Sequence, residues 1–476
     1  MTPRAPRRTA SAGGDVEEIL ITGLSHDGLG VGRLRGEVVF VADCLPGERV
    51  LVRPGHGRRG ARYAQLLERC SSSEQRVKPP CILADHCGGC ATQHLSDPAE
   101  QIWKRERLQQ ALQRIGGLEH PVLPLIAAAD SLGYRNRATI PLGRDADGRL
   151  RAGFYRRGSH RIVNMNHCLV LDPRIDILIA PIKEDLEAGG WPLDADLQAG
   201  GGLRHLGLRL GVHTDEVLVT LVSSTDQLDG LTELARQWRS RWPQLVGVML
   251  NLQPEPTNRL FGAVSQSLDG RSWLLERFAG VELRIGPDTF FQVHTQQAEK
   301  VVSLLLAALK HTGVRSLVDA YCGIGTFSLP LAAAGLSVLG LEQHEGSVQQ
   351  AIANAERNQL ADRCRFLAGD VAALLGAALS GRDALLLDPP RRGLGPQVVA
   401  IIRDQAPALL LYLSCDPATL ARDLAQLCDP GISAEGAAYQ LLSLQPIDFF
   451  PQTSHVETLA VLSCAAQPGT GAAAPR

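Results

Sequence analysis

The chain has 476 residues, of which 45% are hydrophobic, and a formal net charge of −2 at pH 7. This length predicts two or three domains, and the hydrophobic content suffices for a sizeable core. The near-neutral charge excludes a uniformly basic nucleic-acid-binding protein, although a basic surface confined to one face remains compatible with it.

No run is long and apolar enough to span a bilayer, which predicts a protein without a membrane partner. The basic start, MTPRAPRRTASAGG, lacks the apolar core of a signal peptide, so residues 1–15 are expected to be a disordered arm of a cytoplasmic chain. The eleven cysteines then favour metal binding or catalysis over a disulfide framework.

Residues 16–75 contain short β-rich runs separated by glycine turns. Polar and apolar residues alternate in VVFVADC and ERVLVRP, as in half-buried strands. This pattern predicts a small barrel of the oligonucleotide-binding kind, a module that is compatible with RNA binding but does not prove it.

Residues 76–285 are predicted to form a mixed α+β central domain. A helix is expected from Asp97 to about 115–117, with Ser96 or Asp97 as its cap, and it could pack on the catalytic domain. Beyond one cysteine, the stretch from about 120 to 285 shows no recognisable chemistry.

Cysteines gather near the start of this central domain. Three of them form the pattern C-x5-C-G-G-C, and one further cysteine in NMNHCLVLDP is the obvious fourth; these are Cys81, Cys87, Cys90 and Cys168. Four thiolates suit either tetrahedral zinc or a [4Fe–4S] cluster. The nearby histidines, His86, His94 and His167, keep zinc open, although only one short CxxC pair is present.

Residues 286–466 differ from the preceding residues in their hydrophobic pattern, because strongly apolar short runs alternate with helical stretches. Such runs are typical of a parallel sheet covered on both faces, which predicts a doubly wound α/β, Rossmann-like domain. Residues 467–476 are expected to be a disordered tail.

A cofactor site is predicted at the first turn of this domain, in VDAYCGIGTFSLPLA. Gly323 and Gly325 lie where a strand meets a helix, the next strand ends at Glu342, and the third ends at Asp370. An acidic residue at the end of the second strand can bind ribose hydroxyls. Because Ser328 replaces the third glycine of a dinucleotide fingerprint, the pattern favours S-adenosylmethionine over NAD.

A catalytic cysteine is predicted at Cys415, which follows the apolar run ALLLYLS and precedes a helix. The positive end of that helix dipole should favour the thiolate. Asp388, in LLLDPPRRG, should point into the same cleft. The other thiols are expected to be packed structural groups, apart from Cys322 in the cofactor loop; they are Cys44, Cys70, Cys364, Cys428 and Cys464.

Two further segments supply candidate site residues. FFPQTSHVETLAVL places Glu457 at the start of a strand, as a candidate general base or a salt-bridged structural carboxylate. DTFFQVHTQQAEK offers Phe290 and Phe291 for stacking on a flipped base, and Gln292 for contact with the cofactor.

Taken together, these motifs closely resemble the RumA/TrmA-type RNA (uracil-C5)-methyltransferases. The similarity runs through CILADHCGGCATQH, FFQVHTQQAEK, DAYCGIGTFSLPLA, LLLDPPRRGL, LSCDPATLARDL and FFPQTSHVETLAVL, and it includes a TRAM-like barrel at the N-terminus. The presence of barrel and cysteines resembles the RumA branch, whose substrates are mainly in 23S rRNA.

The resemblance implies roles residue by residue. Cys415 would be the nucleophile and Glu457 the base. The S-adenosylmethionine contacts would be Gln292, Tyr321, Thr326, Glu342, Asp370 and Asp388, and the ligands of a [4Fe–4S] cluster would be Cys81, Cys87, Cys90 and Cys168. Two positions depart from the family pattern, since His294 and Thr326 stand where asparagine is usual.

The function expected is therefore methylation of C5 of a uridine in RNA, most simply 23S rRNA, by a monomer that needs no protein partner. Three alternatives remain: a tRNA uridine methyltransferase, an RNA cytosine C5-methyltransferase, and a metal-cluster RNA-binding or assembly protein without activity. A redox role for the cluster is less favoured, because no motif for a redox partner is visible.

Overall fold

In the computed structural model, the described residues are 16–55, 62–197, 201–257, 259–431 and 438–464. The predicted arm, residues 1–15, and the predicted tail, residues 467–476, lie outside these ranges. The chain divides into two compact units, one holding residues up to 85 with 90–100 and 452–454, and the other holding the rest. Within the described ranges, no helix is both long enough and apolar enough to cross a membrane.

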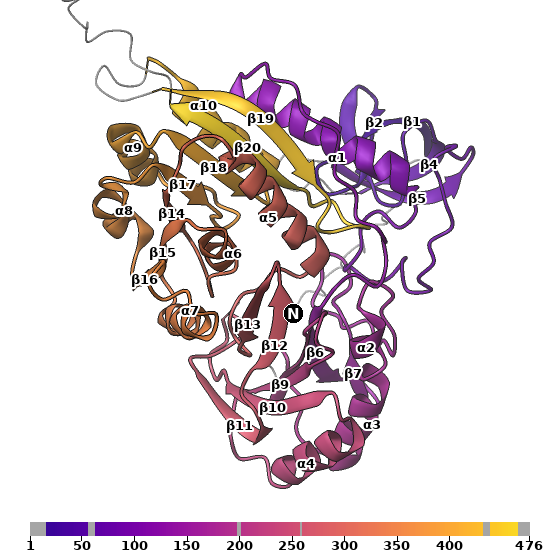
Figure 1. Ribbon diagram of the computed structural model, residues 1–476. Helices are drawn as coiled ribbons and strands as arrows, with labels where there is room; N and C mark the ends of the chain where they lie inside the picture. Colours follow the sequence, from indigo (N-terminus) through magenta and orange to yellow (C-terminus); the bar gives the residue numbers. More distant parts are fainter. Residues whose placement is uncertain (1–15, 56–61, 198–200, 258, 432–437, 465–476) are drawn as a thin grey trace, which may run out of the picture. The chain divides into compact units, whose positions relative to one another are not determined.

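The described part of the first unit contains a closed barrel whose strands run in the order β1-β2-β3-β5-β4 (Figure 1). The strands are β1 Glu17–Leu24, β2 Gly30–Leu34, β3 Glu37–Val41, β4 Arg49–Pro54 and β5 Arg62–Arg69. Strand β1 pairs with both β2 and β4, which closes the barrel. Alternate apolar side chains such as Ile19, Ile21 and Val39 fill its interior. The barrel predicted for residues 16–75 is confirmed.

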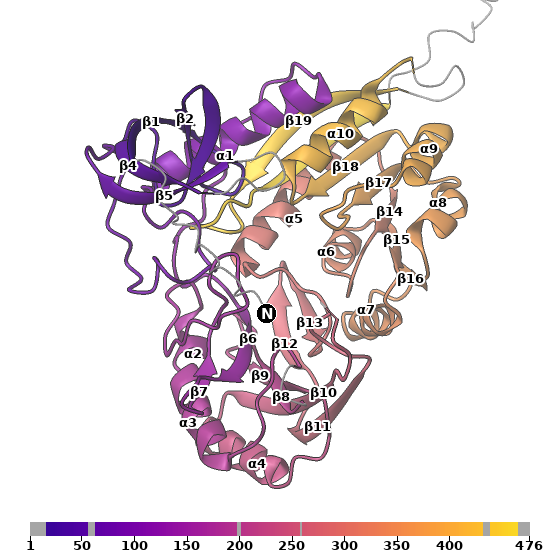
Figure 2. The ribbon, with the colours of Figure 1, turned by 180° about the vertical axis from the view of Figure 1, so that it is seen from behind.

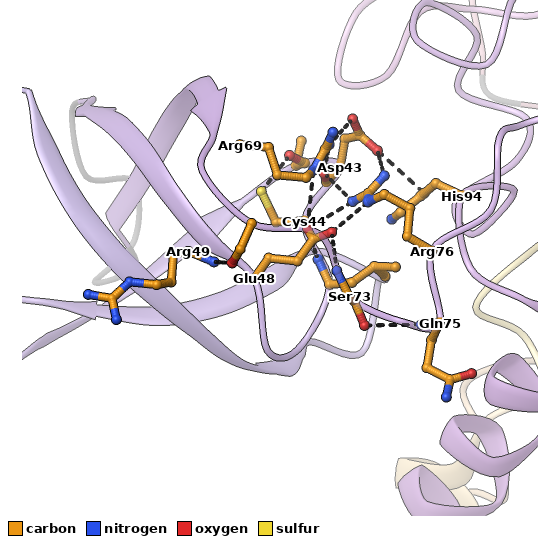
Figure 3. Close-up of polar contacts among 12 residues, drawn as sticks. Asp43, Cys44, Glu48, Arg49, Arg69, Ser73, Gln75, Arg76 and His94 are labelled. Carbon is orange, nitrogen blue, oxygen red and sulfur yellow. Dashed lines mark hydrogen bonds and ion pairs between the residues drawn. The ribbon is translucent and has the colours of Figure 1, made fainter.

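A buried carboxylate ties the barrel to the segment that follows it (Figure 3). Glu48 is fully buried, and its two oxygens accept hydrogen bonds from Arg76 Nε at 2.5 Å and Arg76 Nη2 at 2.9 Å. It also accepts the backbone N–H groups of Leu45 and Ser73. Burial alone would raise the pKa of Glu48, but these hydrogen bonds outweigh burial and lower the pKa.

The second unit contains a six-stranded sheet of order β11-β10-β9-β8-β6-β7 (Figure 1). Its strands are β6 Arg137–Arg144, β7 Leu150–Ala152, β8 Leu203–Leu210, β9 Val217–Ser223, β10 Leu245–Leu252 and β11 Val264–Gly270, and the associated helices are α2 Pro173–Asp176, α3 Ile179–Gly189 and α4 Leu231–Arg241. Strands β8 and β9 are buried along their whole length. This sheet is the central α+β region, and it is called the central sheet below.

A seven-stranded sheet of order β16-β15-β14-β17-β18-β20-β19 forms the other main layer of the second unit. Its strands are β14 Ser316–Ala320, β15 Ser337–Glu342, β16 Cys364–Ala368, β17 Ala384–Leu387, β18 Leu409–Ser414, β19 Tyr439–Ile447 and β20 Glu457–Cys464. The strands from β14 to β18 are parallel, which confirms the doubly wound prediction. The last two are antiparallel, because β20 pairs with β18 and β19 pairs with β20.

Helices cover both faces of this sheet (Figures 1 and 2). One apolar cluster joins one face to α5 Thr295–Leu309, α6 Ser328–Ala333, α7 Glu345–Arg357 and the hairpin of β12 Leu274–Phe278 with β13 Val281–Ile285. A second cluster joins the opposite face to α8 Val371–Leu379, α9 Pro396–Gln405 and α10 Pro417–Cys428. Burial on both faces accounts for the uninterrupted apolar runs of the strands.

The helix expected at 97–117 is α1, Asp97–Ala111, followed by a π-helical turn, Leu112–Gly116. Leu108 and Leu112 are fully buried in the same cluster as Leu420 and Leu424 of α10. This part of the helix therefore belongs to the core beneath the seven-stranded sheet.

Candidate active site

The candidate residues follow from the direction of the parallel strands, which all end at one edge of the seven-stranded sheet. Tyr321 directly follows β14, Glu342 is the last residue of β15, Asp388 follows β17, and Cys415 follows β18. The strand order reverses between β14 and β17, and ligands of open α/β sheets bind in the crevice at such a point.

The loop after β14 has the unusual backbone expected of a ligand-binding turn. Tyr321 has φ 70°, a conformation that is rare outside glycine, and Gly325 has φ 82°. A Cβ on Gly325 would also lie 3.2 Å from atoms of Leu329 and Phe366, so this position has little room for a side chain. Thr326 follows, and its side chain is buried.

Glu342 is held by the same loop. One of its oxygens accepts the Gly323 N–H at 3.1 Å, and the other accepts the His344 N–H at 2.8 Å. Each oxygen retains a second acceptor position, so a ribose hydroxyl can still be bound. Asp370 caps α8 by accepting the Ala373 N–H, which gives it a structural role in addition to the predicted one.

Gln292 and Asp388 meet across the crevice, since Gln292 Nε2 donates to Asp388 Oδ2 at 3.3 Å. Burial, and then the charge of Asp319, raises the pKa of Asp388 to about 8. Asp319 lies in β14, accepts a hydrogen bond from Ser328 Oγ at 2.5 Å, and has its own pKa raised to about 7, chiefly by burial. A cationic ligand in this crevice would stabilise both carboxylates in their charged form.

Cys415 and Glu457 come together because β18 and β20 are antiparallel neighbours. Ser414, the last residue of β18, pairs with Thr458, so the next residue along β18 and the preceding residue of β20 lie at the same edge. Glu457 is buried and begins β20, as predicted. Strand pairing therefore brings together Cys415 and Glu457, which come from separate segments of the sequence.

The expected thiolate is not favoured in this arrangement. Burial, followed by the charges of Glu457 and Asp388, raises the pKa of Cys415 to about 12, although Arg391 acts in the opposite direction. Burial and Asp388 likewise raise the pKa of Glu457 well above its usual range, against the opposing effect of Arg391. The prediction of a lowered thiol pKa from the helix dipole is thus wrong here, because burial, and then two carboxylates from other strands, outweigh the dipole.

A positive group lies beside the nucleophile candidate. Arg391 is exposed, and its Nη2 donates to His455 Nε2 at 3.2 Å. Burial, and then Arg391, lowers the pKa of His455 to about 4, so at neutral pH the ring is an uncharged acceptor. Arg391 therefore has an uncharged partner in His455, and it acts on both Cys415 and Glu457.

Phe290 and Phe291, the predicted aromatic pair before α5, differ in their exposure to solvent. Phe290 is 55% exposed, whereas Phe291 is buried and packs edge-on against Phe278 at 5.5 Å between ring centroids. Only Phe290 is therefore available to stack on a base. His294 is buried and stacked on Tyr134, with 4.9 Å between the ring centroids.

Of the four cysteines proposed as cluster ligands, two are brought near each other within the second unit. Burial is the main cause that raises the pKa of Cys168 to about 11, and the charge of Cys87 adds to it. Gly88 is required at its position, because a Cβ there would lie 2.8 Å from the Tyr155 carbonyl oxygen. Cys81 and Cys90 belong to the first unit.

Within the described ranges, no three or more His, Cys, Asp or Glu side chains gather in a group that could hold a metal ion. The arrangement therefore does not support the expected cluster, although the thiol donor set has the right chemistry for one. The physical reason is that a polynuclear site needs all its thiols around one point, and the pair Cys87 and Cys168 alone does not provide this.

The remaining thiols mostly match the expectation of structural groups. Cys44, Cys322 and Cys364 are buried, and Cys428 and Cys464 are partly buried, but Cys70 is exposed, so the prediction is wrong for Cys70.

Comparisons with known proteins agree with this geometry. The sequence profile of the TRAM domain matches residues 11–53, and that of tRNA (Uracil-5-)-methyltransferase matches 280–368 and 379–464. An uncharacterized RNA methyltransferase of Parasynechococcus marenigrum (strain WH8102) is 50% identical over 94% of this chain and 95% of its own length. Another, from Nostoc sp. (strain PCC 7120), is 45% identical over 94% and 96%. This chain belongs to the family of these RNA methyltransferases, and its C-terminal part matches the tRNA (Uracil-5-)-methyltransferase profile.

The crystal structure of Pyrococcus abyssi tRNA (uracil-54, C5)-methyltransferase in complex with S-adenosyl-L-homocysteine is similar to this methyltransferase as well. The TM-score is 0.75 at 27% identity, covering 94% of this chain and 99% of that one. The methyltransferase is therefore an S-adenosylmethionine-dependent enzyme that acts on RNA, and its barrel is a TRAM domain.

Sequence reasoning missed the residues that hold the site from the central sheet. Asn136, just before β6, donates to the Gln292 carbonyl oxygen and to Thr295 Oγ1, and Arg209 of β8 donates to the Thr289 carbonyl oxygen. The available signal was the polar residues within the strand-like run YRNRATIPLG, which do not fit a simple buried strand.

Proposed function

We propose that this methyltransferase transfers a methyl group to C5 of a uridine in RNA, with Cys415 as covalent nucleophile and Glu457 as base. The observation that carries the proposal is the convergence of Cys415, Glu457 and Asp388 at one end of β17, β18 and β20, with Arg391 beside them. A uracil C5 is too electron-poor to attack a methyl donor directly, and nucleophilic addition at C6 removes this obstacle.

The proposed reaction consists of an addition to C6, a methyl transfer to C5 and an elimination. The thiolate sulfur of Cys415 bonds to C6, and the displaced electron pair makes C5 an enolate carbon. The bound cofactor would supply an electrophilic methyl group; C5 would bond to that methyl carbon, and the sulfur–methyl bond would break to leave S-adenosylhomocysteine. The Glu457 carboxylate then takes the proton from C5, and the electrons of that C–H bond expel the Cys415 thiolate from C6.

Burial raises the pKa of both groups in the arrangement described, so the reaction requires that their charged forms be favoured. The positive charge of the cofactor near Asp388 would act in that direction, as Arg391 already does. We assign the cofactor to Gln292, Tyr321, Thr326, Glu342, Asp370 and Asp388. Glu342 suits the ribose hydroxyls, because it ends the second strand of the sheet and retains acceptor positions.

The first candidate substrate is 23S rRNA, on the ground that a TRAM barrel combined with the four cysteines resembles the RumA branch. The second is tRNA, favoured by the similarity of fold to the Pyrococcus abyssi enzyme. In either RNA the base must leave the stack to reach Cys415, which favours a loop or single-stranded site. We expect the enzyme to act as a cytoplasmic monomer.

Labelled-methyl transfer to total RNA that lacks the modification, followed by nucleoside analysis of separated rRNA and tRNA, tests the function. A 5-methyluridine signal in 23S rRNA supports the first substrate, and the same nucleoside in tRNA supports the second. A methylcytidine signal would show that cytidine, and not uridine, is the target. The absence of any methylated pyrimidine in both pools would favour an RNA-binding protein without this activity.

Two variants test the roles. Cys415→Ala should abolish transfer while S-adenosylhomocysteine still binds. Glu457→Gln should stop release, so that a covalent adduct with RNA accumulates on denaturing gels; an adduct level no higher than in the wild type would assign the base elsewhere.

We further infer that Cys81, Cys87, Cys90 and Cys168 hold a [4Fe–4S] cluster that orders the central region. The four-thiol donor set and the resemblance to the RumA branch support this, whereas only the nearness of Cys87 and Cys168 is visible within one unit. Iron and sulfide analysis with visible absorption of anaerobically purified protein would test it. One zinc per chain instead would favour the tetrahedral site.

A further inference from the structure

The segment that carries Gln292 has no regular structure of its own. It runs from Thr289 to His294, between β13 and α5, and is called the Gln292 loop below. At its end, His294 is the N-cap residue of α5, but its side chain makes no capping hydrogen bond. The direction of the Gln292 side chain therefore depends on contacts from outside the loop.

Those contacts come from the central sheet. Asn136 Nδ2 donates to the Gln292 carbonyl oxygen at 2.9 Å and to Thr295 Oγ1 at 2.9 Å, and the Asn136 N–H donates to the Val293 carbonyl oxygen at 3.0 Å. Asn136 is itself fixed, because its carbonyl oxygen accepts the Leu210 N–H at the end of β8. Its side chain is only 2% exposed, so water does not compete for these bonds.

We propose that Asn136 is a positioning residue for cofactor binding, which holds the backbone of Gln292 so that the Gln292 side chain reaches Asp388. It does so from a sheet that contributes none of the cofactor contacts assigned above. The inference rests on the proposed role of Gln292 and Asp388 as cofactor contacts. It makes the affinity for the cofactor depend on the central sheet.

An amide is the side chain that this position requires. Its single NH₂ group offers two hydrogens to two acceptors, the Gln292 carbonyl oxygen and Thr295 Oγ1. A carboxylate of the same shape could still accept from the Thr295 hydroxyl, but it would repel the Gln292 carbonyl oxygen. Asn136→Asp and Thr295→Val therefore separate the two contacts.

The experiment measures S-adenosylhomocysteine affinity by calorimetry on the full-length protein, with thermal unfolding recorded for every variant. Loss of buried hydrogen bonds in Asn136→Ala should weaken binding roughly tenfold. Gln292→Ala should weaken it at least as much, and the double variant should bind no worse than Gln292→Ala, because one residue acts through the other.

A matched control exists in the same sheet. Asn251 of β10 is fully buried and its Nδ2 donates to the carbonyl oxygens of Gly262 and Val264, far from the Gln292 loop in sequence. Asn251→Ala should lower the unfolding temperature and leave cofactor affinity unchanged. Thr295→Val should also bind normally, whereas Asn136→Asp should bind as weakly as Asn136→Ala; these two variants carry the test if Asn136→Ala does not fold.

Wild-type affinity in Asn136→Asp, or additive losses in the double variant, would overturn the inference, as would normal affinity in Gln292→Ala. Failure of the proposed function looks different. A wild-type protein that binds S-adenosylhomocysteine but methylates no uridine would refute that function and leave the role of Asn136 standing.

Discussion

Two histidines buried without charge should make the fold sensitive to acid. His205 on β8 is 3% exposed, and burial followed by the neighbouring Arg204 lowers its pKa to about 4, against the opposite effect of Asp196. The pKa of His294 is likewise lowered to about 4, chiefly by burial; a hydrogen bond with Gln296 opposes this shift, and the charge of Lys300 adds to it. In the unfolded chain both return to the ordinary value of 6.5.

The direction in which stability changes with pH follows from proton uptake by the unfolded chain. Below the unfolded pKa the unfolded chain binds a proton that the folded chain does not, so the folded state loses stability as the pH falls. At about pH 5, a shift from 6.5 to about 4 costs about 2 kcal/mol per histidine, or about 4 kcal/mol for the two. Because a domain is typically stable by about 5–15 kcal/mol, this loss should be readily measured.

Urea unfolding of wild type and of the double variant His205→Gln/His294→Gln, at about pH 7 and about pH 5, is the assay. The double variant should lose about 4 kcal/mol less than the wild type between the two pH values. His160→Gln, which removes a ring with an 81% exposed side chain, is the control and should behave as wild type. Equal losses in wild type and double variant would refute the reasoning.

Three further perturbations test other parts of the fold. Glu48→Gln should destabilise the barrel unit by about 1–3 kcal/mol, because Arg76 loses one of its two carboxylate partners and keeps only Asp43. Unchanged hydrogen exchange of the barrel amides would contradict this. Asp448→Asn should cost about 3–5 kcal/mol by removing the charge that Lys104 Nζ contacts at 2.8 Å; denaturant unfolding with no change in midpoint would contradict it. Gly88→Ala should lower the iron bound at the proposed cluster site, since its Cβ would meet a carbonyl oxygen at 2.8 Å, whereas Gly89→Ala, with nothing nearer than 3.5 Å, should not.

The sequence could locate the site residues at strand ends, because the carboxyl ends of parallel strands all lie at the same edge of a sheet. Glu342, Asp388 and Cys415 each follow an apolar run, and the edge where such runs end is fixed by the doubly wound fold. The antiparallel direction of β19 and β20 was not predictable, since a buried apolar run looks the same in either direction.

Other features depend on contacts between distant residues, which no local pattern reveals. Asn136 and Gln292 are 156 positions apart, so the hydrogen bond between them has no signature in either segment. The raised pKa of Cys415 likewise depends on Glu457, which β20 brings alongside β18. The position of Cys415 at a helix start is visible in the sequence, whereas the burial and the carboxylates that outweigh the helix dipole become visible only in the tertiary structure.

The position of β20 between β18 and β19 also constrains the order of folding. β18 and β19 do not pair directly, so the sheet cannot be completed until the strand that follows both of them in the chain has entered between them. Pairings of this kind between distant segments form slowly and leave strand edges exposed meanwhile. The nascent chain should therefore acquire its cofactor crevice before its nucleophile and base can meet, and the protein should be most prone to aggregate in that interval.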